Sequence, residues 1–192
     1  MISEFETALV TNALGQFQQF QGLDENDPAL GKQIKAYWTS VGSSFPGVST
    51  PWSAVFVSWC LKTAGATKNE FRFSARHSAF VQWAIGNTET AKGLFRGMRI
   101  EECAPTLGDL IHNNRDNNKF GYDHAATHDS YNSHSAIVVA LGEDHAGRFA
   151  TTIVGNEGTP GTVGRKRVAL NQDGHVIQRA SNPYICVVQC LK

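Results

Sequence analysis

The sequence lacks an excess of charge of either sign and any long apolar run. Its 192 residues carry 17 Lys and Arg against 17 Asp and Glu, so the formal net charge is zero. A neutral chain produces no overall field toward phosphate backbones or anionic membranes, which argues against a nucleic-acid partner. No apolar stretch approaches the roughly 20 residues that span a bilayer, so we expect no membrane insertion.

Cysteine is scarce, and no two cysteines form a recognisable motif. Cys60, Cys103, Cys186 and Cys190 include no Cys-x-x-Cys pair, and their spacing is unlike that of a zinc site. Cys60 falls in an apolar helical stretch and Cys186 in an apolar strand-like stretch, where cysteine usually acts as a small core residue. We expect buried free thiols, with a disulfide as the alternative in an oxidising compartment.

The N-terminus lacks the pattern of a secretion signal. Residues 1–6 are acidic and have neither the basic nor the apolar region of a signal peptide. We therefore expect synthesis in the cytoplasm. Action elsewhere would need an export route other than a cleaved signal.

What the sequence does contain is a change of hydrophobic period near residue 97. Before it, apolar residues recur at helical spacing, and after it they alternate as in strands. The predicted helices cover residues 3–20, 28–41, 51–64 and 74–85, the last with Ser74 as N-cap. The predicted strands cover residues 109–112, 136–141, 149–154, 165–170, 176–179 and 184–189. Residues 113–132 are predicted to be a loop, and residues 171–174 a hairpin turn.

Helices followed by an antiparallel sheet of about five to six strands indicate a single α+β domain. Within it, residues 1–34 are predicted to form an N-terminal helical extension and residues 35–192 the core.

Three residues in this order could carry hydrolytic chemistry. Ser53 lies at the start of an apolar helix, where the helix dipole and free N–H groups favour a developing negative charge. His134 precedes a predicted strand and could supply a base, and Asn156 follows the next strand and could orient the imidazole. Each residue also has an ordinary reading, because Ser53 could cap the helix, His134 could end a strand and Asn156 could belong to a turn.

A cluster of histidines supports a rival hypothesis. His112, His124, His128 and His134 fall within about two dozen residues, and three histidines can hold a catalytic zinc ion. The segment contains no His-Glu-x-x-His motif, and two of these histidines lie in the predicted loop. We therefore predict no metal site. His77, in the preceding helical region, is expected to face either the core or the cleft.

Residues 50–60 resemble the nucleophile helix of the cysteine/histidine-dependent amidohydrolase/peptidase (CHAP) family, which is papain-like and related to NlpC-type peptidoglycan peptidases. Residues 107–111 resemble its Pro-Gly-Asp-Ile-Val strand, residues 133–139 its histidine strand and residues 153–158 its Glu-Gly-Asn segment. The match covers residues 35–190. A bacterial branch of undetermined function is similar in having Pro-Trp-Ser-Ala and then Phe-x-x-Ser-x-x-His, here residues 71–77.

The resemblance implies a papain-like fold and a site in which Ser53, His134 and Asn156 are catalytic and no cofactor is needed. Trp52, His77, Asp109 and Glu157 would then shape the substrate cleft. Ser53 departs from the family, which usually has a more nucleophilic cysteine at this position. Three interpretations stay open: a natural serine nucleophile, a cysteine replaced by serine to inactivate the enzyme, or a domain that binds without cutting.

The function implied by the resemblance is hydrolysis of amide bonds in the peptide part of peptidoglycan. Export by a contact-dependent system such as type VI would make the protein an antibacterial effector acting in the periplasm of a target cell, with a secretion-apparatus component and a cognate immunity protein as partners. A phage lysin would suit the same features. The alternatives are a non-catalytic wall-binding module of the same fold, or a lipid esterase or acyltransferase.

Overall fold

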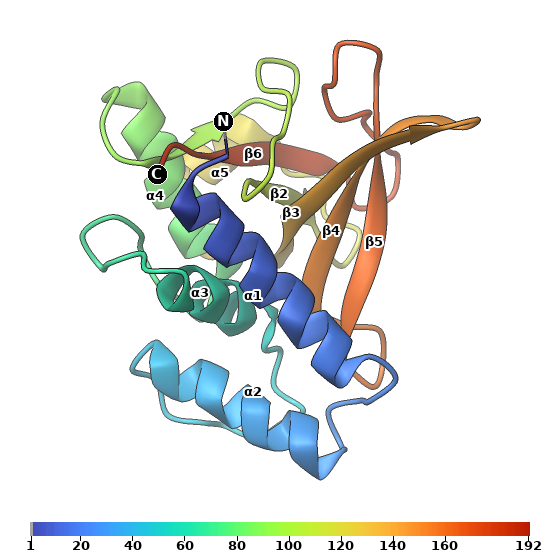
Figure 1. The fold of residues 1–192 in the computed structure, drawn as a ribbon. Helices are drawn as coiled ribbons and strands as arrows, with labels where there is room; N and C mark the ends of the chain where they lie inside the picture. Colours follow the sequence, from blue (N-terminus) through green and yellow to red (C-terminus); the bar gives the residue numbers. More distant parts are fainter. Residues whose placement is uncertain (1) are drawn as a thin grey trace.

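A computed structural model describes residues 2–192 and shows helices packed on one antiparallel sheet (Figure 1). The helices are α1 (Glu4–Phe20), α2 (Pro28–Ser40), α3 (Ser53–Thr63), α4 (His77–Glu89) and α5 (Tyr122–Thr127). The strands are β1 (Phe95–Met98), β2 (Leu110–Asn114), β3 (Ser133–Asp144), β4 (Gly147–Glu157), β5 (Thr162–Leu170) and β6 (Tyr184–Cys190). The predicted α+β class is therefore confirmed, and no helix within residues 2–192 has the length and apolar character needed to cross a bilayer.

The sheet has six strands in the order β1-β6-β2-β3-β4-β5, and each neighbouring pair is antiparallel. The register of β2 and β3 decides which face of the sheet carries each of two histidines. It pairs His112 with Ser135 and Asn113 with His134. Because successive side chains of a strand point to opposite faces, His112 and His134 lie on opposite faces of the sheet.

The ends of the first two helices follow familiar capping chemistry. The Ser3 hydroxyl accepts a bond from the Glu6 N–H while the Glu6 carboxylate accepts one from the Ser3 N–H, which forms a capping box at the start of α1. Asp27 caps α2 by accepting a bond from Ala29 N–H, and Pro28 occupies the first helical position.

The apolar core is divided by the sheet. The larger cluster joins the helices to one face and includes Leu9, Phe56 and Ile137, whereas the smaller cluster on the other face includes Ile111 and Val138. Helix α1 contributes Phe5, Leu9, Ala13 and Phe20 to the larger cluster, so its inner face belongs to the main core. The division into an extension over residues 1–34 and a core over 35–192 stays a prediction.

The chain ends lie near one another, as Figure 1 shows. The Ser3 hydroxyl donates a 2.7 Å hydrogen bond to the Lys192 carbonyl, and Lys192 Nζ also contacts the Glu70 carboxylate. The four cysteines are buried and free, as the sequence predicted.

Four details differ from the expectations. Residues 176–179 form no strand, since only Val176 makes an isolated bridge to Leu170. Strand β1 was not predicted, and the predicted loop over residues 113–132 contains the short helix α5. The N-cap of α4 is Arg76, while the Ser74 hydroxyl accepts a bond from the Arg76 N–H in the turn before the helix.

Candidate functional site

The first residue of α3 is Ser53, which is 3% exposed. The N-cap is Trp52, and no side chain within residues 2–192 caps this helix. Ser53 is therefore not the capping residue that an ordinary interpretation suggested. Its side chain instead points to a histidine, while the N–H groups of the first helical turn face the position where an anion would be stabilised.

The histidine that contacts Ser53 is His77. Its Nε2 lies 2.7 Å from Ser53 Oγ, and the side chain is 5% exposed. Its Nδ1 has no hydrogen-bond partner within the described chain, and the ring packs edge-on against Phe80 and His134, with centroids 5.4 and 5.3 Å away. The sequence and the family resemblance predict His77 in the cleft wall and His134 as the partner of Ser53. The structure gives that contact to His77, because the first turn of α4 faces the first turn of α3.

Burial sets the protonation state of His77. It lowers the pKa of the imidazole well below the usual value, and the nearby His134, His112 and Arg115 lower it further. The ring is therefore neutral at physiological pH. A neutral imidazole with the proton on Nδ1 can accept the proton of the Ser53 hydroxyl at Nε2.

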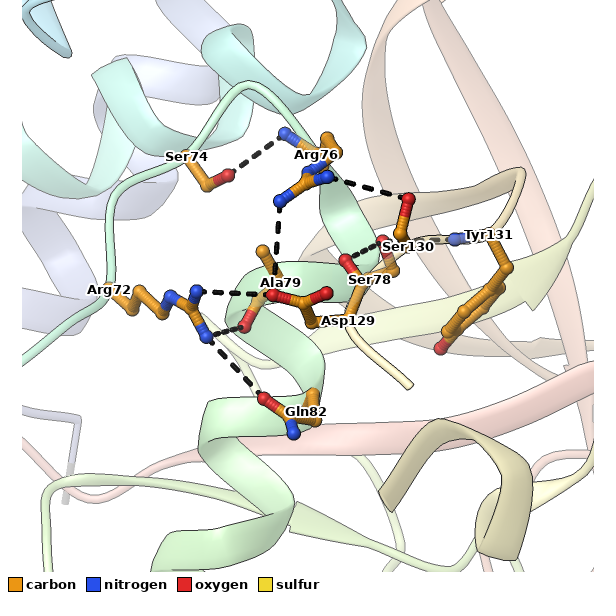
Figure 2. Close-up of polar contacts among 9 residues, drawn as sticks. All are labelled: Arg72, Ser74, Arg76, Ser78, Ala79, Gln82, Asp129, Ser130 and Tyr131. Carbon is orange, nitrogen blue, oxygen red and sulfur yellow. Dashed lines mark hydrogen bonds and ion pairs between the residues drawn. The ribbon is translucent and has the colours of Figure 1, made fainter. Parts of the chain in front are cut away.

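A group of surface contacts centred on Asp129, which we call the latch, holds the loop after α5 against the start of α4 (Figure 2). Asp129 lies between the guanidinium groups of Arg72 and Arg76, at 3.3 and 3.8 Å. The Ser78 hydroxyl donates to the Asp129 carbonyl at 2.8 Å. These contacts set the position of Tyr131, two residues further on, relative to His77.

The end of β4 fixes the start of α3. Asn156 Oδ1 accepts a 3.2 Å bond from the Trp52 N–H, and Glu25 Oε2 accepts bonds from both Trp52 Nε1 and Asn156 Nδ2. A Cβ on Gly155 would lie 2.7 Å from Phe56 Cβ, so glycine is required where the strand meets the helix. Asn156 therefore positions the backbone before Ser53. It makes no hydrogen bond to a histidine, contrary to the orienting role that we predicted for it.

His134 makes no hydrogen bond to Ser53. The His134 side chain is almost completely buried, at 6% exposed. Even so, neither of its ring nitrogens has a hydrogen-bond partner within residues 2–192. Burial, followed by the charges of Arg115 and Lys166, lowers its pKa to about 3. Its side chain lines a second cavity, which does not include Ser53.

His112 lies on the helix-facing side of the sheet and is fully bonded. Its Nδ1 is 2.8 Å from Ser135 Oγ, and its Nε2 is 3.1 Å from Tyr131 Oη. Burial lowers its pKa to about 3. The ring lies 6.4 Å from that of His77, so this network supports the wall behind the Ser53 and His77 pair.

The other predicted substrate-binding residues lie away from Ser53 Oγ. Trp52 is completely buried and stacks on Tyr37. Asp109 lies just before β2, where it accepts bonds from the Thr106 and Cys190 N–H groups. Burial raises its pKa to about 6.

Glu157 pairs with Lys166 and lines the cavity of His134. None of Trp52, Asp109 and Glu157 lines the cavity that contains Ser53. Their predicted contact with the substrate therefore finds no support in this arrangement.

An open cavity of about 780 Å³ gives access to Ser53 and His77. Its charged lining residues are Glu25, Arg76, Arg115 and Asp116, two of each sign. Much of the remaining lining is polar, and includes Ser49, Ser130, Asn132, Ser133, Asn156 and Thr159. The cavity therefore suits a polar ligand that carries both donors and acceptors.

The histidines of the rival metal hypothesis are dispersed. His112 and His134 point to opposite faces of the sheet, while His124 on α5 stacks at 4.0 Å on His128, the residue that follows this helix. Within residues 2–192 no three His, Cys, Asp or Glu side chains are grouped so that they could hold a metal ion.

Comparison with known families gives one match. Residues 17–187 match a family described as an uncharacterized protein conserved in bacteria (DUF2272), and the chain belongs to this family. No curated protein and no solved structure matches the chain.

Sequence reasoning missed two contacts of the site. The Ser53 to His77 bond joins two helix starts 24 residues apart, and the signal for it was the Phe-x-x-Ser-x-x-His segment that ends at His77. Glu25 was placed in the extension, yet it lines the cavity and bonds Trp52 and Asn156. No local pattern marks Glu25, because its role depends on the loop between α1 and α2 returning to the end of β4.

Proposed function

We propose that this protein hydrolyses amide bonds in the peptide part of bacterial peptidoglycan, with Ser53 as nucleophile and His77 as its base. The observation that carries the proposal is the 2.7 Å bond between Ser53 Oγ and His77 Nε2 beside an open polar cavity. A serine hydroxyl becomes an effective nucleophile when an adjacent base removes its proton during attack.

In the proposed reaction, Ser53 Oγ attacks the carbonyl carbon while its proton moves to His77 Nε2. The negative charge that develops on the carbonyl oxygen is stabilised by N–H groups of the first turn of α3. When the C–N bond breaks, His77 returns the proton to the departing amine. Water then attacks the acyl-serine, and His77 accepts its proton and passes it back to Ser53. The sequence of steps uses no cofactor.

The lining of the cavity favours a peptide substrate over a lipid. Peptidoglycan stem peptides carry amides, carboxylates and amines, which complement the paired signs of Glu25 and Asp116 against Arg76 and Arg115. An acyl chain would need an apolar channel. For this reason the amidase hypothesis is preferred to the lipid esterase or acyltransferase.

Ser53 lies at the start of a helix that packs against an antiparallel sheet. This arrangement also supports our proposal that the fold is papain-like. An effector role, with export into the periplasm of a target cell and an immunity protein that covers the cavity, is part of the same proposal and depends on the hydrolase activity. A non-catalytic wall-binding module is the second candidate, because the cavity could hold a wall fragment without cutting it.

The test is to incubate peptidoglycan sacculi, and separately a lipid ester, with the wild-type protein, Ser53→Ala and Ser53→Cys. Mass spectrometry then identifies the products. We expect new amine and carboxylate termini on stem peptides from the wild type and none from Ser53→Ala. Binding of sacculi by all three proteins without cleavage would identify the binding module. Cleavage by Ser53→Cys alone would show that the natural chemistry requires a thiol.

A further inference from the structure

A second cavity, of about 300 Å³, opens on the opposite side of the sheet from α3 and has strongly basic walls. Its cations are Arg115, Lys166, Arg167 and Arg179, whereas its only acidic lining residue is Glu157. Neutral donors from Asn113, Ser181 and Asn182 complete much of the polar lining.

Two of these cations have no carboxylate partner within the described chain. Lys166 pairs with Glu157, and Arg167 pairs with Asp144. Arg115 and Arg179 form no ion pair among residues 2–192. Arg115 donates a hydrogen bond to the Asn156 carbonyl, and Arg179 donates one to the Asn182 carbonyl. The Arg179 guanidinium also lies 4.4 Å from the centre of the Tyr184 ring, a contact that leaves its charge unbalanced. The pocket therefore has about two positive charges that the protein itself does not balance.

His134 supplies an independent observation. Its imidazole lines this pocket and is more than nine-tenths buried, and neither ring nitrogen has a hydrogen-bond partner among residues 2–192. Burying a polar group without a hydrogen bond is costly, so folded proteins rarely leave one without a protein, water or ligand partner. The neutral imidazole retains one N–H donor that an acceptor in the pocket could use.

We infer that this pocket binds a phosphate dianion, free or as a monoester, between the guanidinium groups of Arg115 and Arg179, with the imidazole of His134 as a further donor. Two unpaired guanidinium groups match the charge of a dianion, and their planar forks match phosphate oxygens. The inferred site is separate from Ser53, although Arg115 also lines the larger cavity.

The test is calorimetric titration of the folded full-length protein with inorganic phosphate, glycerol 3-phosphate and acetate at pH 7.5. The key variant is Arg179→Gln. Its matched control is Arg165→Gln, which removes the same charge from β5, on the opposite face, where Arg165 lies over the Phe17 ring at 5.3 Å. We expect saturable binding of phosphate that Arg179→Gln weakens at least tenfold and Arg165→Gln changes less than twofold.

Nuclear magnetic resonance of the wild-type imidazoles provides a second measurement that needs no variant. Phosphate should shift the ring nitrogen signals of His134 and leave those of exposed His145 unchanged. Tighter binding of glycerol 3-phosphate would identify an esterified phosphate as the ligand, and tighter binding of inorganic phosphate would identify the free anion. Either result supports the inference.

Three outcomes would overturn the inference: no saturable phosphate binding, acetate binding as tightly as phosphate, or equal weakening by Arg165→Gln. None of these measurements depends on hydrolysis. A negative result for phosphate binding would therefore not contradict the proposed amidase activity. Likewise, an absence of amidase activity would not contradict phosphate binding.

Discussion

His112 and His134 lie on neighbouring strands and are almost equally buried, yet their environments differ. His112 points toward the helices and both of its nitrogens are bonded, to Ser135 and Tyr131. His134 points to the other face, makes no hydrogen bond within residues 2–192 and is surrounded by cations. The difference indicates that His112 stabilises the fold, whereas His134 is held in place by its neighbours and is available to a ligand.

His77 falls between these two cases. One nitrogen contacts Ser53 and the other has no partner in the part of the chain that the structure describes, so the ring is positioned but retains capacity for a further hydrogen bond. A histidine that accepts and returns a proton needs this combination, because a ring with both nitrogens tied to structural partners would have to break a bond to react.

The largest expected effect separates His77 from His134 in catalysis. If His77 is the base, His77→Ala should lower kcat at least about 10³-fold, as removal of a serine hydrolase's base does. His134→Ala should cause a much smaller loss, because its ring does not contact Ser53. The measurement is the rate of stem-peptide cleavage by each purified variant, with circular dichroism to confirm folding. The reverse pattern would restore the assignment that the family resemblance implied.

The second prediction concerns stability. His112→Leu leaves the Ser135 and Tyr131 hydroxyl groups unpaired, and we expect it to lower the free energy of unfolding by about 2–4 kcal/mol. His134→Leu removes a side chain that has no hydrogen bond to lose, so its cost should stay below about 1 kcal/mol. Urea unfolding of both variants measures the difference. Equal losses in the two variants would mean that the hydrogen bonds of His112 contribute nothing to the stability of the fold.

The third prediction uses acid to test the buried histidines together. His112 and His134 have pKa values of about 3 in the folded state, and that of His77 is also lowered. In the unfolded chain a histidine has a pKa of about 6.5. Below that pH the unfolded chain binds protons at these histidines that the folded chain does not bind, so the free energy of unfolding falls as the pH falls. Asp109 opposes this, because its folded pKa of about 6 lets the folded chain bind a proton first.

His112 and His134 together outweigh Asp109 by about one proton, which corresponds to a loss of roughly 1.4 kcal/mol per pH unit between pH 6 and pH 4, and the lowered pKa of His77 adds to this loss. Urea midpoints at pH 7, 5.5 and 4.5 measure this slope. His134→Leu should reduce the slope by about 1.4 kcal/mol per unit, and exposed His145→Gln serves as the control. A slope that His134→Leu leaves unchanged would show that His134 titrates normally in the folded protein.

The sequence predicted the fold better than it predicted the site. Periodicity located α1 and α2 closely, and the apolar alternation located β3 to β6, because a buried face repeats every 3.6 or every two residues. It also placed Ser53 near the start of a helix, although the predicted helix began two residues earlier than α3 does. It could not assign the partner of Ser53, since His77 and His134 both approach the site in three dimensions. That choice depends on which face of the sheet His134 takes, and the register of β2 and β3 places it on the face away from Ser53.

The smallest expected effect concerns the latch that holds Tyr131, and through it His112, against α4 (Figure 2). Asp129→Asn removes the ion pairs to Arg72 and Arg76, whose side chains are 42% and 56% exposed. Exposed pairs contribute little, so we expect a loss below about 1 kcal/mol that largely disappears in 1 M salt. The matched control is Asp123→Asn, which removes the exposed pair to Arg99. Unfolding at low and high salt gives both values, and a salt-independent loss above about 2 kcal/mol would show that the latch carries part of the stability assigned here to the His112 network.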